Sequence, residues 1–517
     1  MARSLRRQRL FCAALVSGTF FLYLWIAVNI PNTFDDWEWG GSIGMHNLMT
    51  CAVNSRYGGN LLVVVLTRCQ VLKDLVMALF FTAIPCCMTA FIMEYLHRFH
   101  PEAAAWPMKP LLFLTANVLI FLLPAPVWCQ TYGWVSGFCN YITSGLFLVL
   151  YFLFVIRLDR ASAGEGRSAV RYAVIFACGG VMQLFLENLS AFFFMTSLFL
   201  VLRRVLKKQK PEKELLVLLL GNALGLVLVF SSAIYPELWS TGEAVAYEGV
   251  SYRKLLFDPN DGPLKSVGSL IRIWYYDRQP AMIDYSGVLP PAILVVMLLY
   301  GFSGSRIKSR SVGLLLLLLH AVPFAYTVYR YLFLRFEIWI DYIDRIDTMS
   351  ANLFYFSYLV IVTADLFLFF RKDPGFPWLL GMWVSPILII APMSAINTVF
   401  ERSFYTTTLC YQLFLLLLLP PLWHAWKPPL RRVTAACAAA CFLVLAGYYA
   451  HVYYDIGLVK RERLSAVDRA RRGESGSVYL APYPHNAFVY REDPYDDRYK
   501  AVFREYYKLP QDTQIDF

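Results

Sequence analysis

Long apolar runs separated by short polar connections form the main pattern along the chain. A helix needs about 20 apolar residues to cross the hydrocarbon core of a bilayer, because unpaired backbone groups are too costly there. Thirteen runs are candidates for such helices: 10–30, 74–96, 110–125, 139–156, 170–185, 189–203, 214–233, 286–302, 311–330, 353–370, 376–394, 404–424 and 432–452. The pattern predicts an all-α polytopic membrane protein with about 13 transmembrane helices.

The composition of the 517-residue chain supports this prediction. Hydrophobic residues make up 58% and charged residues only 16%, and a soluble core could not bury that much apolar surface. The formal net charge of +11 comes from short basic clusters between the apolar runs, which is typical of cytoplasmic loops. This arrangement disfavours nucleic-acid binding and makes a lipid bilayer the expected partner.

The basic clusters also predict an orientation. They fall on every second connection, on the same side as the basic N-terminus: Arg98/Lys109, Arg157/Arg160/Arg167/Arg171, Arg203/Arg204/Lys207/Lys208/Lys210/Lys213, Arg306/Lys308/Arg310, Arg371/Lys372 and Lys427/Arg431/Arg432. We therefore expect a multi-pass protein with a cytoplasmic N-terminus and an extracytoplasmic C-terminus. The lack of targeting signals beyond the first helix favours a bacterial plasma (inner) membrane. The first run has no small-residue cleavage site, which favours an uncleaved helix over a signal peptide.

Two domains are expected. Residues 1–452 would form the transmembrane domain. Residues 453–517 are no longer membrane-like, and their pattern predicts a short strand at 477–482 and an amphipathic helix at 497–507. We expect this tail to form a small α/β cap on the outer face, where it would lean on the transmembrane domain.

Candidate chemistry begins directly after the first helix. Asp35 and Asp36 are adjacent carboxylates at a membrane exit, where they repel each other and must lose water. Such a carboxylate can act as a general base on a hydroxyl group, or can bind a cation. The alternative is a solvated turn beside an interfacial tryptophan anchor.

The same loop continues with Asn54, Ser55 and Arg56, followed by Gly58-Gly59. The planar guanidinium of an arginine suits phosphate oxygens, and paired glycines permit a close approach of the backbone. An ordinary interfacial arginine explains the same residues equally well.

Other outer connections are polar at the membrane rim. They contain Trp134 and Asn140, the turn Glu187-Asn188, and Glu401-Arg402. Taken singly, each is explained by a helix cap, an ion pair or a snorkelling side chain. Together they predict a cluster of binding residues on the outer face.

Two further segments carry charge. Asp341, Asp344 and Asp347 recur every three residues in 331–352, which predicts an amphipathic interfacial helix with an acidic stripe. We favour the interpretation that this stripe is a solvated helix face over the interpretation that it binds a cation. The long loop 234–285 carries Arg253 and Arg272 among aromatic residues, and either receives an anionic lipid or polymer or simply connects two helices. The chain has no P-loop, GxGxxG, GxSxG or HExxH motif.

These residues together resemble the GT-C class of integral membrane glycosyltransferases, and more narrowly the Gtr-type glucosyltransferases and related bacterial proteins. The resemblance runs in order over most of the chain: Asp35-Asp36-Trp37, Asn54-Ser55-Arg56, Trp134-x-Ser-Gly-x-x-Asn140-Tyr141, Glu187-Asn188 and Glu401-Arg402-Ser403. The position of Asp35-Asp36 is the most specific part of it. Ser55 stands where that family often has glycine.

The resemblance implies a polyprenyl-phosphate-linked sugar as donor and a cell-surface glycan or lipid as acceptor on the outer face. Asp35 or Asp36 would take the proton from the acceptor hydroxyl, in an inverting displacement. Arg56 and Arg402 would hold the departing lipid phosphate, and Asn54, Trp134, Asn140, Glu187, Asn188 and Glu401 would contribute to substrate binding. No cofactor is required, although a divalent cation could assist.

Two other functions remain open. A lipid-linked polysaccharide polymerase or ligase would also have about a dozen spans, and would use Arg253 or Arg272 in its long outer loop. It does not need an acidic pair after the first helix, which ranks it second. A flippase or transporter would need charged groups within its spans, and Asp365 is the only strong candidate for one.

Overall fold

The computed structural model describes residues 2–51, 54–158, 169–246, 251–258, 260–303, 309–336 and 348–517. Over these residues the chain is almost entirely helical. Nine helical segments are long and apolar enough to cross a membrane: α1 (Ala2–Asn29), α5 (Gln70–Phe99), α8 with α9 (Val135–Gly137, Thr143–Leu158), α11 (Glu187–Leu206), α17 (Arg310–Phe336), α19 (Thr348–Phe370), α20 (Phe376–Ile390), α21 (Tyr405–Ala425) and α22 (Pro428–Arg471).

Three further spans are sharply bent. Their helix pairs are α6 (Met108–Phe121) with α7 (Ala125–Thr131), α12 (Lys213–Val229) with α13 (Ile234–Thr241), and α14–α15 (Pro263–Ile273, Gln279–Asp284) with α16 (Leu289–Phe302). The bends measure 98°, 71° and 82°. Counting each pair as one span gives up to 12 in the described residues. The chain is therefore a multi-pass helical membrane protein.

Each of the thirteen predicted runs coincides with a helix. The predicted run at 170–185 corresponds to α10 (Ala169–Met182), which is not among the twelve spans above. This helix has only 14 residues and is short for a full crossing. The count of thirteen spans therefore remains a prediction, whereas the positions of the apolar helices are confirmed.

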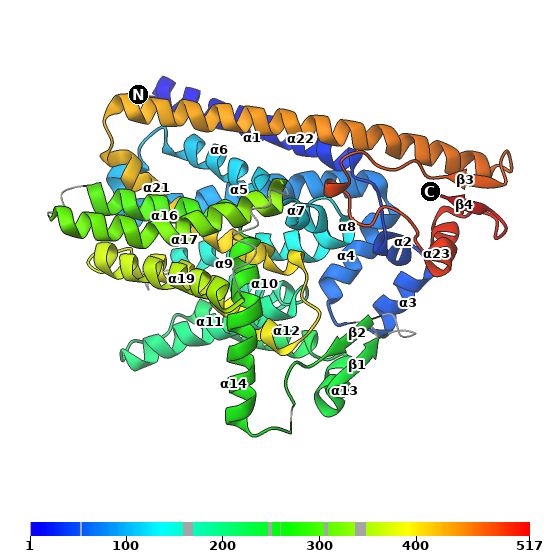
Figure 1. The fold of residues 1–517 in the computed structure, drawn as a ribbon, viewed down its shortest axis with the longest axis horizontal. Helices are drawn as coiled ribbons and strands as arrows, with labels where there is room; N and C mark the ends of the chain where they lie inside the picture. The colour runs from blue at the N-terminus through cyan, green and yellow to red at the C-terminus, as the bar shows by residue number, and fades with distance from the viewer. Residues whose placement is uncertain are drawn as a thin grey trace.

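The termini lie at opposite ends of the helical bundle (Figure 1). We call the end where α1 begins the N-terminal face and the end where α1 stops the C-terminal face. The longest helix, α22, runs beside α1 from one face to the other, and the Trp25 indole donates a hydrogen bond to the Ala450 carbonyl, 3.2 Å away. The Lys460 ammonium donates to the carbonyls of Val28 and Ile30 at 2.7 and 3.0 Å, which caps the end of α1.

The segment after α22 packs on the C-terminal face. Its elements are β3 (Ser477–Tyr479), α23 (Asp497–Tyr507) and β4 (Gln514–Asp516), with β3 and β4 paired in parallel. Tyr499, Val502 and Phe503 of α23 are buried in a cluster with Phe34 and Trp37. A strand and an amphipathic helix thus occur where the pattern predicts them. The helix α22, however, continues through residue 452, so no break in the chain marks the expected domain boundary.

Short elements complete the C-terminal face, namely α2 (Asp35–Gly40), α3 (Ser42–Thr50), α4 (Tyr57–Arg68) and the antiparallel hairpin of β1 (Glu243–Ala246) and β2 (Ser251–Lys254). Figure 1 shows α2, α4, α8 and α23 gathered there. The predicted acidic helix with Asp341, Asp344 and Asp347 lies outside the described residues.

Candidate functional site at the C-terminal face

The two adjacent carboxylates have different surroundings. Phe34 adopts a φ of 50°, an uncommon conformation for a bulky residue, as the chain leaves α1 and enters α2. Asp36 is fully buried, and its Oδ1 accepts hydrogen bonds from the backbone amide of Ser136 at 2.8 Å and from its hydroxyl at 2.5 Å. Its Oδ2 accepts from the Thr33 amide at 3.0 Å. Asp36 therefore fastens α2 to α8.

Asp35 is only partly buried, and its carboxylate makes no hydrogen bond or ion pair within the described residues. Burial first, and then the neighbouring Glu38 carboxylate, raise the pKa of Asp35 to about 7, although Arg402 and Arg491 lower it. Burial also raises the pKa of Asp36 to about 6, against the hydrogen bonds from Ser136 and Thr33. Asp35 is thus an available carboxylate that gains and loses its proton near neutral pH.

Arg402 is held by aromatic rings and an amide. Its Nη1 donates to Gln130 Oε1 at 3.0 Å and to the Tyr490 hydroxyl at 3.2 Å. Its guanidinium carbon lies 4.4 to 6.0 Å from the ring centroids of Phe400, Trp134, Tyr490 and Tyr141. Among the described residues it has no carboxylate within ion-pair distance. Arg402 therefore keeps an uncompensated positive charge, stabilised by cation–π contacts.

Arg56 is compensated instead. Its Nε lies 3.1 and 2.9 Å from the two carboxylate oxygens of Glu187, and its Nη2 lies 2.7 Å from Glu187 Oε2. The Tyr235 hydroxyl donates to Glu187 Oε1 at 2.7 Å, and Arg253 Nη1 lies 3.7 Å from the same oxygen. Glu187 thus forms ion pairs with two arginines and accepts a hydrogen bond from a tyrosine.

Tyr141 lies between the two predicted arginines. Its ring is 6.0 Å from the Arg402 guanidinium. Burial works against the charge on Arg56, but Glu187 and, less strongly, Tyr141 raise the pKa of Arg56. Tyr141 belongs to a π-helical turn, Phe138–Ile142, between α8 and α9, a feature frequent at functional sites. Ser136, which binds Asp36, lies one turn before Tyr141. The short segment 136–141 therefore links the Asp35–Asp36 turn to the surroundings of both arginines.

The paired glycines allow the close approach that the sequence predicts. The Gly58 amide donates to the Leu184 carbonyl at 2.9 Å, and a Cβ at Gly58 would lie 2.7 Å from the Phe185 ring. A Cβ at Gly59 would overlap the amide oxygen of Asn140. The contacts of Gly58 pack α4 against the segment just before α11, which places Arg56 next to Glu187. The contact of Gly59 packs α4 against the π-helical turn.

The remaining predicted residues are also on this face, several of them in structural roles. Asn54 Oδ1 accepts from the Arg56 amide at 2.9 Å and from Asn60 at 3.1 Å, which closes the start of α4. Asn188 donates to the Ile389 carbonyl at 3.3 Å and joins α11 to α20. Glu401 Oε2 accepts from Gln130 at 2.6 Å. Helix capping and packing therefore account for Asn54 and Asn188.

Several buried polar atoms at this site have no hydrogen-bond partner in the described part of the chain. They are Asn32 Oδ1, Thr33 Oγ1, Ser55 Oγ, Trp134 Nε1 and Asn140 Oδ1. Unsatisfied buried polar atoms are uncommon in folded proteins, and their concentration here is typical of a place that water or a ligand completes.

Some residues of this site carried no assignment from the sequence. Gln130, Tyr490 and Arg491 belong to no recognisable motif. Ser136 and Tyr141 belong to the segment Trp134–Tyr141, which carries part of the family resemblance. Their spacing along one helix was the only sequence feature that could have indicated a role at the site.

The long loop 234–285 reaches the site through three sets of contacts. Its hairpin places Arg253 on Glu187, and Asn397 and Ile396 pair with Lys254 and Leu255 of the same loop. The buried Arg278 donates to the carbonyls of Met393 and Ile396 at 3.1 and 2.8 Å. The loop thus supports the segment that leads to Arg402, whereas Arg272 is exposed.

Comparisons with known proteins give no family. No protein-family model matches the chain, and no curated protein or solved structure is similar to it. Within the described ranges, no group of three or more His, Cys, Asp and Glu side chains is arranged to hold a metal ion.

Proposed function

We propose that the chain is a membrane glycosyltransferase of the GT-C type, which transfers a sugar from a polyprenyl-phosphate carrier to a glycan or lipid acceptor at the C-terminal face. The observation that carries this proposal is that an available carboxylate, Asp35, and the uncompensated cation Arg402 are held in the same cluster. The ring of Phe34, next to Asp35, packs edge-on against Tyr490 with centroids 5.9 Å apart, and the Tyr490 hydroxyl accepts a hydrogen bond from Arg402 at 3.2 Å. Transfer of a glycosyl group from a phosphate needs both groups close together: a base for the acceptor and a cation for the leaving group.

The residues divide this work as follows. Asp35 accepts the proton of the acceptor hydroxyl as its oxygen attacks the anomeric carbon. The bond between that carbon and the phosphate oxygen breaks, and polyprenyl phosphate leaves with the electron pair. Attack opposite to the leaving group inverts the anomeric centre. Asp36 does not touch the substrate in this proposal; it positions α2 through Ser136 and Thr33.

The phosphate is assigned to Arg402 rather than Arg56. Arg56 is neutralised by a bidentate pair with Glu187, so a phosphate would have to displace a carboxylate to use it. Arg402 has only neutral partners, Gln130 and Tyr490, and a phosphate would add the missing charge. The aromatic rings around it exclude water and strengthen this attraction.

A lipid carrier also needs space for its apolar chain. A pocket of about 670 Å³ lies between α9, α11 and α20, and Ala191 and Phe192, one turn after Glu187, belong to its wall. Met195, Phe199 and Trp378 continue that wall into the spans. An apolar pocket that begins beside the polar cluster suits a polyprenyl tail whose phosphate sits at the rim.

The test is sugar transfer in membranes, with a panel of polyprenyl-phosphate hexoses as donors and release of polyprenyl phosphate as the readout. Asp35→Asn should lower the rate about 10²–10⁴-fold, the usual contribution of a general base. Asp512→Asn, an exposed acid near the C-terminus, is the matched control. Wild-type rates for Asp35→Asn would refute the assignment of the base.

The runner-up is a lipid-linked polysaccharide polymerase or ligase, and one contact favours it. Arg253 of the long loop lies 3.7 Å from Glu187, within the same cluster. If Arg253→Gln abolishes transfer while Asp35→Asn does not, the polymerase is the better description. Lys265→Gln, on the exposed part of that loop, serves as the charge-matched control.

A further inference from the structure

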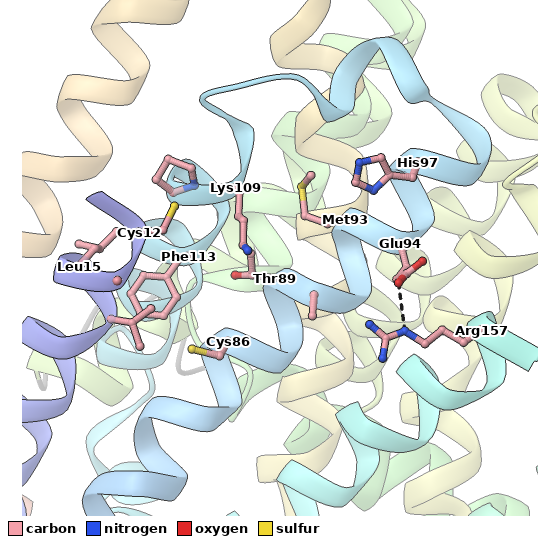
Figure 2. Close-up of a pocket in the computed structure, with 14 residues that line it drawn as sticks. Cys12, Leu15, Cys86, Thr89, Met93, Glu94, His97, Lys109, Phe113 and Arg157 are labelled. Carbon is pink, nitrogen blue, oxygen red and sulfur yellow. Dashed lines mark hydrogen bonds and ion pairs between the residues drawn. The ribbon is translucent and has the colours of Figure 1, made fainter. Parts of the chain in front are cut away.

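A second polar pocket lies at the opposite end of the bundle. It has a volume of about 560 Å³ and is formed between α1, α5, α6 and α9 at the N-terminal face. Figure 2 shows its residues: Lys109 reaches from α6 toward Thr89 of α5, with His97 and the Glu94–Arg157 pair on one side and Cys12 and Phe113 on the other. Nothing in the proposed transfer reaction uses this pocket.

The charges of this pocket leave one cation available. Arg157 Nε lies 3.0 Å from Glu94 Oε1, so these two groups neutralise each other. Lys109 has no carboxylate within ion-pair distance among the described residues. It stands in the first turn of α6, whose N-terminal amides add positive potential to the same place. The polar end of the pocket therefore favours an anion.

The rest of the pocket is apolar. Cys12 and Val16 of α1, Cys86 and Met93 of α5, and Phe113 of α6 form its walls. In Figure 2, Cys12 and Phe113 lie across the pocket from His97, and Cys86 lies further along α5. A ligand that fills this space has an anionic end and an apolar end.

Exposed aromatic residues beside the pocket are typical of the lipid headgroup region. Trp106, three residues before Lys109, is 46% exposed, and its ring packs edge-on against Phe11 of α1 with centroids 6.0 Å apart. Tryptophan side chains at this position mark the boundary between hydrocarbon and water. Phe11 and Leu10 are themselves 53% and 61% exposed, so lipid must cover the adjacent surface of α1.

We propose that this pocket binds an anionic phospholipid of the leaflet at the N-terminal face, with its phosphate at Lys109 and an acyl chain along Phe113 and Cys86. Basic pockets between spans select anionic headgroups in this way. The proposal is independent of the transferase, because the pocket and the candidate site lie at opposite faces.

The experiment is a titration of the delipidated full-length protein with phosphatidylglycerol or phosphatidylcholine, followed by native mass spectrometry of the bound lipid. Phosphatidylglycerol should bind the wild type more tightly, and Lys109→Gln should weaken it about fivefold, the effect of one basic contact. Lys372→Gln removes an exposed charge between α19 and α20 and should bind as the wild type does.

Thermal unfolding provides a second readout. Phosphatidylglycerol should raise the melting temperature of the wild type and of Lys372→Gln, and raise it less in Lys109→Gln. Equal binding by all three proteins, or equal binding of the two lipids, would overturn the proposal. Inorganic phosphate should have no such effect; if it stabilises the wild type equally, the pocket takes a free anion and the assignment to a lipid is wrong.

Discussion

The carboxylate of Asp36 accepts hydrogen bonds from both the amide and the hydroxyl of Ser136, 100 residues further along the chain. This contact uses one member of the acidic pair for structure and leaves Asp35 available. The same short segment that carries Ser136 places Tyr141 beside Arg402. Fastening α2 to α8 is therefore what brings the available carboxylate and the uncompensated arginine to the same end of the molecule.

Asp36 should make the stability of the protein depend on pH. Burial raises its pKa from 3.8 to about 6, so the folded protein holds this proton more tightly than the unfolded chain does. The contribution is fully present below pH 3.8 and is lost as the pH rises through about 6, by about 3 kcal/mol. Thermal unfolding of the purified protein between pH 4 and 8 measures it. Asp36→Asn should flatten this decline, and an unchanged decline would show that other groups cause it.

The pH dependence of transfer should report on Asp35. Only its ionised form accepts a proton, so the rate should rise through about pH 7 and level off above it. Glu38→Gln removes a carboxylate that raises the pKa of Asp35, so the rise should move to lower pH. Arg491→Gln removes a cation that lowers this pKa, so the rise should move to higher pH.

The opposite signs of these two shifts are the control. A general loss of structure would lower the plateau in both variants and leave the midpoint where it is. If Glu38→Gln and Arg491→Gln move the midpoint in the same direction, Asp35 is not the group that titrates.

Gly59→Ala should damage the site without touching a charged residue. The new Cβ would overlap the Asn140 amide oxygen and push α4 away from the π-helical turn, at a cost of about 1–3 kcal/mol. Transfer should fall because the displaced π-helical turn also carries Tyr141, whose ring lies 6.0 Å from the Arg402 guanidinium. Gly447→Ala, at an open position in α22, should leave both stability and transfer near wild type, and a similarly silent Gly59→Ala would contradict the packing described.

Arg56 and Glu187 should behave as a coupled pair. Glu187→Gln leaves Arg56 and Arg253 together without their shared anion, and Arg56→Gln leaves Glu187 with the more distant Arg253. Each single variant should lose about 2–4 kcal/mol of stability, and the double variant should lose less than the sum. Thermal unfolding of the four proteins gives the coupling energy. Strict additivity would show that the pair contributes nothing, and would return Arg56 to the list of phosphate ligands.

The positions of the membrane helices follow from the sequence because an apolar run of this length has few alternatives to a helix in lipid. The angles of the bends do not follow from it: Pro124 indicates that the helix breaks between α6 and α7, but packing decides the angle of 98°. The sequence also places Asp35, Arg56, Glu187 and Arg402 on one face through the alternation of basic loops.

The partners of these residues could not be predicted. Asp35 and Asp36 are equivalent in the sequence, yet neighbours on a helix point about 100° apart, so one faces Ser136 and the other does not. The Arg56–Glu187 pair joins residues 131 positions apart, and nothing local distinguishes a neutralised arginine from an available one. Tyr490 and Arg491 come from the tail, whose docking depends on the buried surface of α2 and α23.

The buried pair of His320 and Asp365 offers a last test, of transport against transfer. His320 Nδ1 lies 2.8 Å from the Leu316 carbonyl, which can only accept, so Nδ1 carries a proton. His320 Nε2 lies 2.7 Å from Asp365 Oδ2, and a single proton between them makes the pair neutral overall. Asp365→Asn keeps the shape and can donate to Nε2, so a transferase should retain its stability and its activity. Asp365→Ala leaves the buried ring without a partner and should cost about 1–3 kcal/mol. If the Asp365→Asn protein is stable but has lost its activity, the proton shared by His320 and Asp365 moves during the functional cycle, as in a transporter. That result would count against the transferase.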